Sequence, residues 1–129
     1  MPVIGWGGFF FRARDPEELG VWYRDMLGVG AGCGTDEQGQ SSDWFWHPEP
    51  GPVVFAPFKA DSDYFAGDKA FMLNFRVRDL DGLLEQLNAA GIDILTKAEW
   101  DSPETGRFAR IHDPEGNPIE LWEPPVAEA

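Results

Sequence analysis

The sequence has little cysteine and little positive charge, and each shortage excludes a class of protein. Cys33 is the single cysteine among 129 residues, so an intrachain disulfide is impossible, and we expect a bystander thiol because no second cysteine is present. Ten lysines and arginines against 23 aspartates and glutamates give a formal net charge of −13, which repels phosphate backbones and anionic lipid. We therefore expect neither a nucleic-acid partner nor a membrane partner.

Long apolar runs and the common catalytic motifs are also missing. Gly5, Gly7 and Gly8 interrupt the first ten residues, which carry no basic segment typical of a secretion signal, so the sequence predicts a cytoplasmic protein. There is no nucleophile elbow, no phosphate-binding glycine loop followed by lysine, no HExxH pattern and no paired-cysteine site. The sequence therefore gives no indication of a serine hydrolase, a nucleotide-binding protein or a zinc protease.

Turn chemistry near the carboxyl end predicts a β-hairpin. Asp113, Pro114 and Gly116 suit the first, second and fourth positions of a type I turn, so residues 106–111 and 118–122 are predicted to pair. The period of two within the second strand places Ile119 and Leu121 on one face, and Glu120 with Trp122 on the other. A carboxylate beside an aromatic ring suits a ligand cleft as well as it suits solvent.

Two helices are predicted from their capping residues. Asp15 suits a helix N-cap, with Pro16 at the first helical position, and Gly28 suits the stop. A second helix is predicted between Asp79 and Gly91, where leucines recur at helical spacing.

The two halves of the chain repeat one pattern, strand, helix and three strands. Residues 11–15 and 75–79 match at four of five places. Strands are predicted over residues 3–13, 42–46, 53–58, 71–77, 92–96, 105–111 and 118–122, with a further short strand in the glycine-rich residues 28–40. We therefore predict an α+β domain of two tandem βαβββ modules, which form one curved, mostly antiparallel sheet with a concave cleft and helices on the convex side.

Residues 1–129 are predicted to form a single domain. Its parts are the first module at about 1–60, a connector at about 61–69, the second module at about 70–124 and a flexible tail at 125–129. The connector contains Tyr64 and Phe65, and an aromatic pair in a linker packs against something. It is either a latch on the domain or on a dimer partner, or a lid over a ligand.

Several segments together resemble the vicinal oxygen chelate superfamily, which includes glyoxalase I, extradiol dioxygenases, and bleomycin- and fosfomycin-resistance proteins. The resemblance is carried by residues 14–17, 22–28, 79–81, 89–91 and 113–121. It implies a divalent metal held in the cleft by side chains from strands one, five and eight, often two histidines and a glutamate, with a fourth from strand four in glyoxalases. The matching positions in this sequence are Gly8, Met72, Glu120 and, on strand four, Val54.

The implied ligand set is incomplete in this chain. Glycine, methionine and valine supply none of the nitrogen or oxygen donors that such a cation needs, which leaves Glu120 alone. His47 and His112 lie beside turns, where a surface or turn role competes with a ligand role. We therefore predict no metal and no other cofactor, unless unexpected donors such as Asn74 join Glu120.

Strand parity predicts which side chains line the cleft. Aromatic area, an amide and two arginines share the face of Gly8 and Glu120, which is the mixed lining of a small-molecule pocket. The predicted cleft residues are Phe10, Arg12, Met72, Asn74, Arg76 and Trp122. Glu120 itself has three possible roles: pairing with Arg12 or Arg76, orienting a ligand, or acting as a general base.

The function predicted from these features is that of a glyoxalase/bleomycin resistance-like protein, which binds a small organic molecule in its cleft without the family metal. The alternative is an enzyme of the same superfamily, of lyase, dioxygenase or isomerase type, with Glu120 as its ligand or base. A non-catalytic interaction module is a third possibility. Because members of this fold also pair chains or exchange modules, we expect a homodimer.

Overall fold

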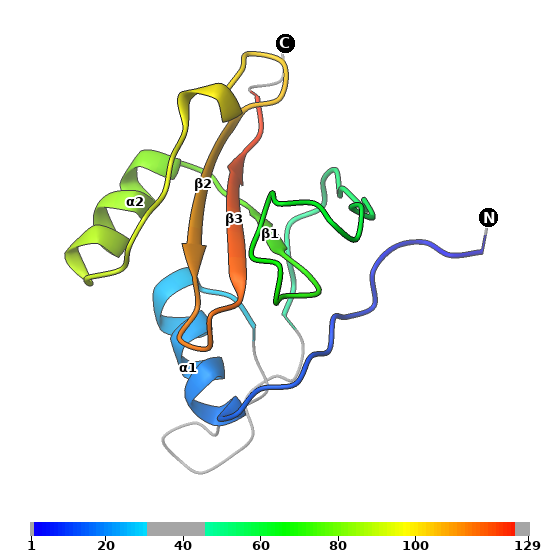
Figure 1. Cartoon of the computed structure of the whole chain (residues 1–129), viewed down its shortest axis with the longest axis vertical. Helices are drawn as coiled ribbons and strands as arrows, with labels where there is room; N and C mark the ends of the chain where they lie inside the picture. Colours follow the sequence, from blue (N-terminus) through cyan, green and yellow to red (C-terminus); the bar gives the residue numbers. More distant parts are fainter. Residues whose placement is uncertain (1, 31–45, 126–129) are drawn as a thin grey trace. The chain divides into compact units, whose positions relative to one another are not determined.

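The computed structural model describes residues 2–30 and 46–125, and the chain divides into two compact units, Met1–Phe45 and Trp46–Ala129 (Figure 1). The predicted strand at residues 42–46 lies outside the described residues except for Trp46. Cys33, most of the predicted short strand in residues 28–40 and the tail beyond residue 125 lie outside them as well.

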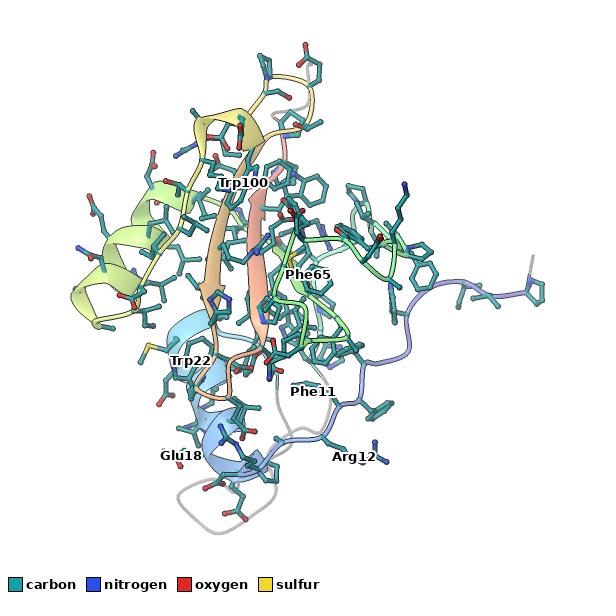
Figure 2. All side chains as sticks on the ribbon, in the orientation of Figure 1. Phe11, Arg12, Glu18, Trp22, Phe65 and Trp100 are labelled. Atoms are coloured by element: carbon teal, nitrogen blue, oxygen red, sulfur yellow. The ribbon has the colours of Figure 1, made fainter. Side chains whose placement is uncertain are left out.

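The described residues of the first unit form helix α1 (Pro16–Leu27), which begins and ends where its caps predict. The Asp15 carboxylate accepts a hydrogen bond from the backbone N–H of Glu18 at 3.1 Å, which satisfies a donor that the helix itself leaves unpaired. Gly28 takes the left-handed conformation, with φ 66°, and its N–H donates to the carbonyl of Arg24. Leu19 is buried on the predicted apolar face, while Figure 2 shows the side chain of Glu18 on the same helix.

The predicted strand at residues 3–13 is wrong, because the structure has no strand there. Gly5, Gly7 and Gly8 offer no side chain to pack, which weakens a strand. Phe10, predicted to line the cleft, is 86% exposed in this segment.

The second unit is built on a mixed three-stranded sheet, whose strands are β1 (Leu73–Arg76), β2 (Arg107–His112) and β3 (Pro118–Glu123). The order is β1-β3-β2, with β1 parallel to β3 and β2 antiparallel to it. Helix α2 (Leu80–Ala89) follows β1 and contacts β3 (Figure 1). An α+β class is therefore confirmed, whereas the tandem βαβββ repeat stays a prediction.

The β2–β3 hairpin and its turn confirm the prediction from sequence. The backbone N–H of Gly116 donates to the carbonyl of Asp113 at 2.9 Å, and Gly116 has φ 83°. The buried Asp113 carboxylate accepts hydrogen bonds from the backbone N–H groups of Glu115 and Asn117 and from the Asn117 amide. This network fixes the register in which the two strands meet.

The core of the second unit lies on the face of the sheet that carries Ile119 and Leu121. Register places Ile111 opposite Ile119 and Ala109 opposite Leu121, and all four side chains are fully buried. Helix α2 contributes further buried apolar area, from Leu80 and Leu87. The predicted split between apolar and polar faces of β3 is thus confirmed.

Two further predicted strands differ in the structure. Residues 53–58 form no strand, and Pro57 within the segment weakens one because proline has no N–H for a strand ladder. The strand predicted at residues 92–96 is reduced to one bridge, Leu95 with Arg110. Among the described residues, no helix has the length and apolar character needed to cross a membrane.

Candidate functional site

Glu120 lies on the face of the sheet opposite the buried leucine and isoleucine side chains of β3. Register places Asn74 of β1 and Arg110 of β2 on either side of it. Glu120 is only 7% exposed, and both of its carboxylate oxygens accept hydrogen bonds. Oε2 accepts from the Tyr64 hydroxyl at 2.6 Å, and Oε1 accepts from Asn74 Nδ2 at 2.8 Å. Glu120 therefore ties β1 and the connector to the centre of the sheet.

The predicted pairing of Glu120 with Arg76 is wrong. Arg76 Nη2 donates to the carbonyl of Glu49 at 2.6 Å, and Nη1 donates to that of Pro50 at 3.4 Å. Asn74, not Arg76, stands opposite Glu120 in the parallel register, so the neutral amide reaches the carboxylate. The other predicted partner, Arg12, belongs to the first unit, and that pairing stays a prediction.

Arg110, which was not predicted as a site residue, lies beside Glu120 on the same face of the sheet. It is only 5% exposed, and Nη1 donates to the carbonyl of Tyr64 at 3.2 Å. Its guanidinium carbon lies 4.9 Å from the centre of the Tyr64 ring and 5.4 Å from that of Trp100, which are cation–π distances. Within the described part of the chain, its Nε and Nη2 atoms are buried without a hydrogen-bond partner.

A pocket of about 590 Å³ opens beside Arg110. One side is formed by the connector, and the other by residues that precede and form β2. Phe65 and Trp100, both labelled in Figure 2, are its aromatic walls. The lining comprises residues 60–67, Leu95, Lys97, Trp100 and Arg110.

The connector is held in place by Tyr64. Its hydroxyl bonds to Glu120, and its ring contacts those of Phe58 at 5.6 Å and Trp100 at 6.0 Å between centroids. The sequence left a latch and a lid as alternatives for this segment. In the structure, Tyr64 makes the contacts of a latch within the chain, while the segment around it, Phe65 included, walls the pocket.

The hydrogen bond to Glu120 also changes the acid–base behaviour of Tyr64. Burial, followed by the hydrogen bond and the negative charge of Glu120, raises the pKa of the Tyr64 hydroxyl to about 12. The hydroxyl therefore remains a hydrogen-bond donor throughout the neutral and mildly alkaline range.

This pKa predicts a loss of stability in alkali that depends on one hydroxyl. In the unfolded chain Tyr64 titrates near 10.0, whereas in the folded protein it holds its proton to about 12. Between these values the folded state binds more protons than the unfolded state, so stability falls as pH rises. We expect urea midpoints to fall more steeply from pH 10 to pH 12 in the wild type than in Tyr64→Phe. Equal slopes would contradict the assigned pKa.

The cleft residues predicted from sequence have different partners in the structure. Asn74 joins Glu120, while Trp122 donates Nε1 to the carbonyl of Thr105 at 2.7 Å and stacks on Phe108. Met72 is half-buried just before β1. Arg76 holds backbone carbonyls, and Phe10 and Arg12 belong to the first unit. A shared cleft for this set stays a prediction.

Sequence reasoning missed the pocket residues outside the connector, which are Leu95, Lys97, Trp100 and Arg110. A signal existed for Arg110, because the hairpin turn pairs residue 112 with 118 and therefore residue 110 with Glu120. Nothing of this kind marks Trp100, which lies in the short 3-10 helix η1 (Ala98–Trp100).

The residues that the superfamily resemblance assigns to a metal do not fit one. Met72 offers a thioether, Gly8 and Val54 offer no donor side chain, and both Glu120 oxygens accept hydrogen bonds. In residues 2–30 and 46–125, no group of three or more histidine, cysteine, aspartate or glutamate side chains is placed to hold an ion. We therefore derive no chemistry through a metal.

Comparison with known proteins now places the chain. A family model described as Glyoxalase-like domain matches residues 8–122, so the chain belongs to this family and to the vicinal oxygen chelate superfamily. A solved structure with a similar fold is TnmS3, an antibiotic binding protein from Streptomyces sp. CB03234. That structure is 22% identical, with a TM-score of 0.54, and the match covers 96% of this chain and 98% of that one. No curated protein matches the sequence.

Proposed function

We propose that this protein binds a small organic molecule in the pocket beside Arg110, as a glyoxalase/bleomycin resistance-like binding protein, without the family metal or another cofactor. The observation that carries the proposal is a buried arginine between two aromatic rings in the lining of a pocket of about 590 Å³, with two N–H groups that have no partner among the described residues. Aromatic walls with a few polar groups are typical of small-molecule sites. The antibiotic-binding neighbour of similar fold supports the same function.

The geometry favours binding over catalysis. A general base needs a lone pair directed at its substrate, but Glu120 is only 7% exposed and its two oxygens are held by Tyr64 and Asn74. Glu120 is also absent from the pocket lining, because Tyr64 stands over it. In this proposal Glu120 positions the pocket wall, and an enzyme that uses Glu120 as ligand or base is the second choice.

We further propose the domain organisation, the wider cleft and the homodimer that the sequence predicts. Two tandem βαβββ modules form one domain, in which Phe10, Arg12, Met72, Asn74, Arg76 and Trp122 extend the ligand-binding cleft. The protein is a cytoplasmic homodimer that acts on neither nucleic acid nor membrane. Multi-angle light scattering tests the dimer directly, because a monomer mass would contradict it.

A pocket-filling substitution tests the proposed function. Gly67 lines the pocket, and a Cβ there would meet nothing within 4 Å, so Gly67→Trp adds a large side chain to the pocket lining without a clash at its Cβ. We expect 2-naphthoate, 2-naphthamide or a bleomycin to raise the melting temperature of the wild type in the presence of EDTA. The same probes should have no effect on Gly67→Trp.

The control for this experiment is Glu85→Trp, which adds the same side chain to the exposed surface of α2. It should respond to the probes as the wild type does. Absence of any shift in the wild type, or an equal shift in Gly67→Trp, would contradict binding in this pocket.

A further inference from the structure

We infer that the pocket selects ligands that carry a carboxylate on a flat aromatic group, and that Arg110 is the residue that recognises the carboxylate. The inference rests on the proposed function, since it names the ligand class of the same site. The geometry that points to it is the orientation and burial of one guanidinium.

The two unpaired nitrogens of Arg110 belong to one edge of the guanidinium. Nε and Nη2 carry parallel N–H bonds on that edge, whereas Nη1 is already used by the carbonyl of Tyr64. Two parallel N–H donors match the two oxygens of a carboxylate, the bidentate arrangement in which arginine binds this group best. This edge of Arg110, a buried residue in the pocket lining, therefore matches a planar anion in geometry.

Energetics also favour an anion at this edge. A buried charge with free donors is costly, and the cost is relieved when an acceptor of opposite charge fills the donors. The rings of Tyr64 and Trp100 hold the guanidinium plane by cation–π contact, and its buried Nε and Nη2 have no acceptor among the described residues. A bound carboxylate would supply that acceptor.

The charges around the pocket repel an anion at long range, so its attraction to Arg110 acts only at short range. The net charge of −13 repels anions at long range, and Asp61 and Asp63 at the pocket are both exposed to solvent. Exposed charges are screened by water and salt, whereas the buried charges of Arg110 and its register neighbour Glu120 are screened much less. The hydrogen bonds from Tyr64 and Asn74 offset part of the Glu120 charge, which opposes an anion here. Lys97, which lies 5.5 Å from the centre of the Trp100 ring, adds a second positive charge to the lining.

The aromatic walls determine the rest of the ligand. Tyr64, Phe65 and Trp100 all line the pocket, and Leu95 adds aliphatic surface. Aromatic side chains favour offset or edge contacts with another ring, which a flat ligand makes with little loss of freedom. A rigid aromatic acid therefore fits this pocket better than a flexible aliphatic one.

The test compares two probes that differ only in charge, 2-naphthoate and 2-naphthamide, by calorimetric titration and quenching of tryptophan fluorescence. The wild type should bind the carboxylate on the order of 10- to 100-fold more tightly than the amide, as a charge-assisted bidentate contact implies. Arg110→Lys keeps the charge but removes the fork, and it should abolish most of this preference. Arg107→Lys is the matched control, because that exposed guanidinium pairs with Asp81 outside the pocket.

Three other results of these titrations would contradict the inference or the role of Arg110. Equal affinity of the wild type for the two probes would overturn the inference while leaving small-molecule binding intact, and this comparison needs no variant to fold. A preference that survives in Arg110→Lys would assign recognition to another residue and overturn the role of Arg110. Failure of both probes to bind would overturn the inference, and with failure of the bleomycin the proposed function as well.

Discussion

Replacing Leu121 by alanine is expected to lower the free energy of unfolding by about 3 kcal/mol, because truncation of a buried leucine removes apolar contact and leaves a cavity. Leu121 is fully buried at the centre of β3, with β1 on one side and β2 on the other. Its register partners, Phe75 and Ala109, come from both neighbouring strands. Urea unfolding followed by circular dichroism measures the effect.

The control for this result is Leu95→Ala, which removes the same atoms from a side chain that is 47% exposed. We expect a loss of less than about 1 kcal/mol there, because a half-exposed side chain gains less from burial. Equal losses in the two variants would contradict the core assigned to the second unit.

Replacing Glu120 by alanine is expected to lower the free energy of unfolding by about 3 kcal/mol, since two hydrogen bonds to a charged acceptor are lost and the part-buried Tyr64 hydroxyl loses its partner. The donors are the Tyr64 hydroxyl and the Asn74 amide. Because Tyr64 holds the connector, the pocket wall should loosen, and affinity for 2-naphthoate should fall together with stability. Unfolding and binding measured on one preparation test both effects.

Glu120→Gln separates the acceptor from its charge. It retains one carbonyl oxygen and the shape of the side chain, so we expect about half of the stability loss seen with alanine. A full loss of stability in Glu120→Gln would show that the charge itself is required. Unchanged stability in Glu120→Ala would contradict the positioning role of Glu120.

The parts of the fold that the sequence predicts correctly are those specified by local chemistry. Asp15 and Gly28 mark the ends of α1 because capping needs only neighbouring atoms. Asp113 and Gly116 mark the β2–β3 turn for the same reason, and the period of two then assigns the two faces of β3. Family membership follows from these segments together.

The parts that fail depend on distant partners. Residues 53–58 have the composition of a strand but do not form one. A strand also needs backbone N–H donors, and Pro57 in this segment has none. Arg76 was wrong as a partner of Glu120 because the parallel register of β1 against β3 cannot be obtained from a period of two. Parity assigned both Asn74 and Arg76 to the face of Glu120, and only the register selects Asn74.

The pocket itself was beyond sequence reasoning for a different reason. Its walls are the connector and the segment around Trp100, which lie in irregular structure without a repeating pattern. Tyr64 and Phe65 could be recognised as residues that pack, but what they pack against depends on the folded chain. Arg110 could have been found from the hairpin register alone, because it lies opposite Glu120.

The most direct test of ligand binding beside Arg110 is a nitrogen-15 NMR titration of the wild type with 2-naphthoate, in which the Arg110 Nε–H signal is assigned by its absence in Arg110→Lys. Binding in the pocket predicts a progressive shift of this signal and slower exchange of its proton with water. The largest backbone changes should fall in residues 60–67 and at Trp100. An unchanged Arg110 signal at saturating probe would contradict the assignment of this pocket as the binding site.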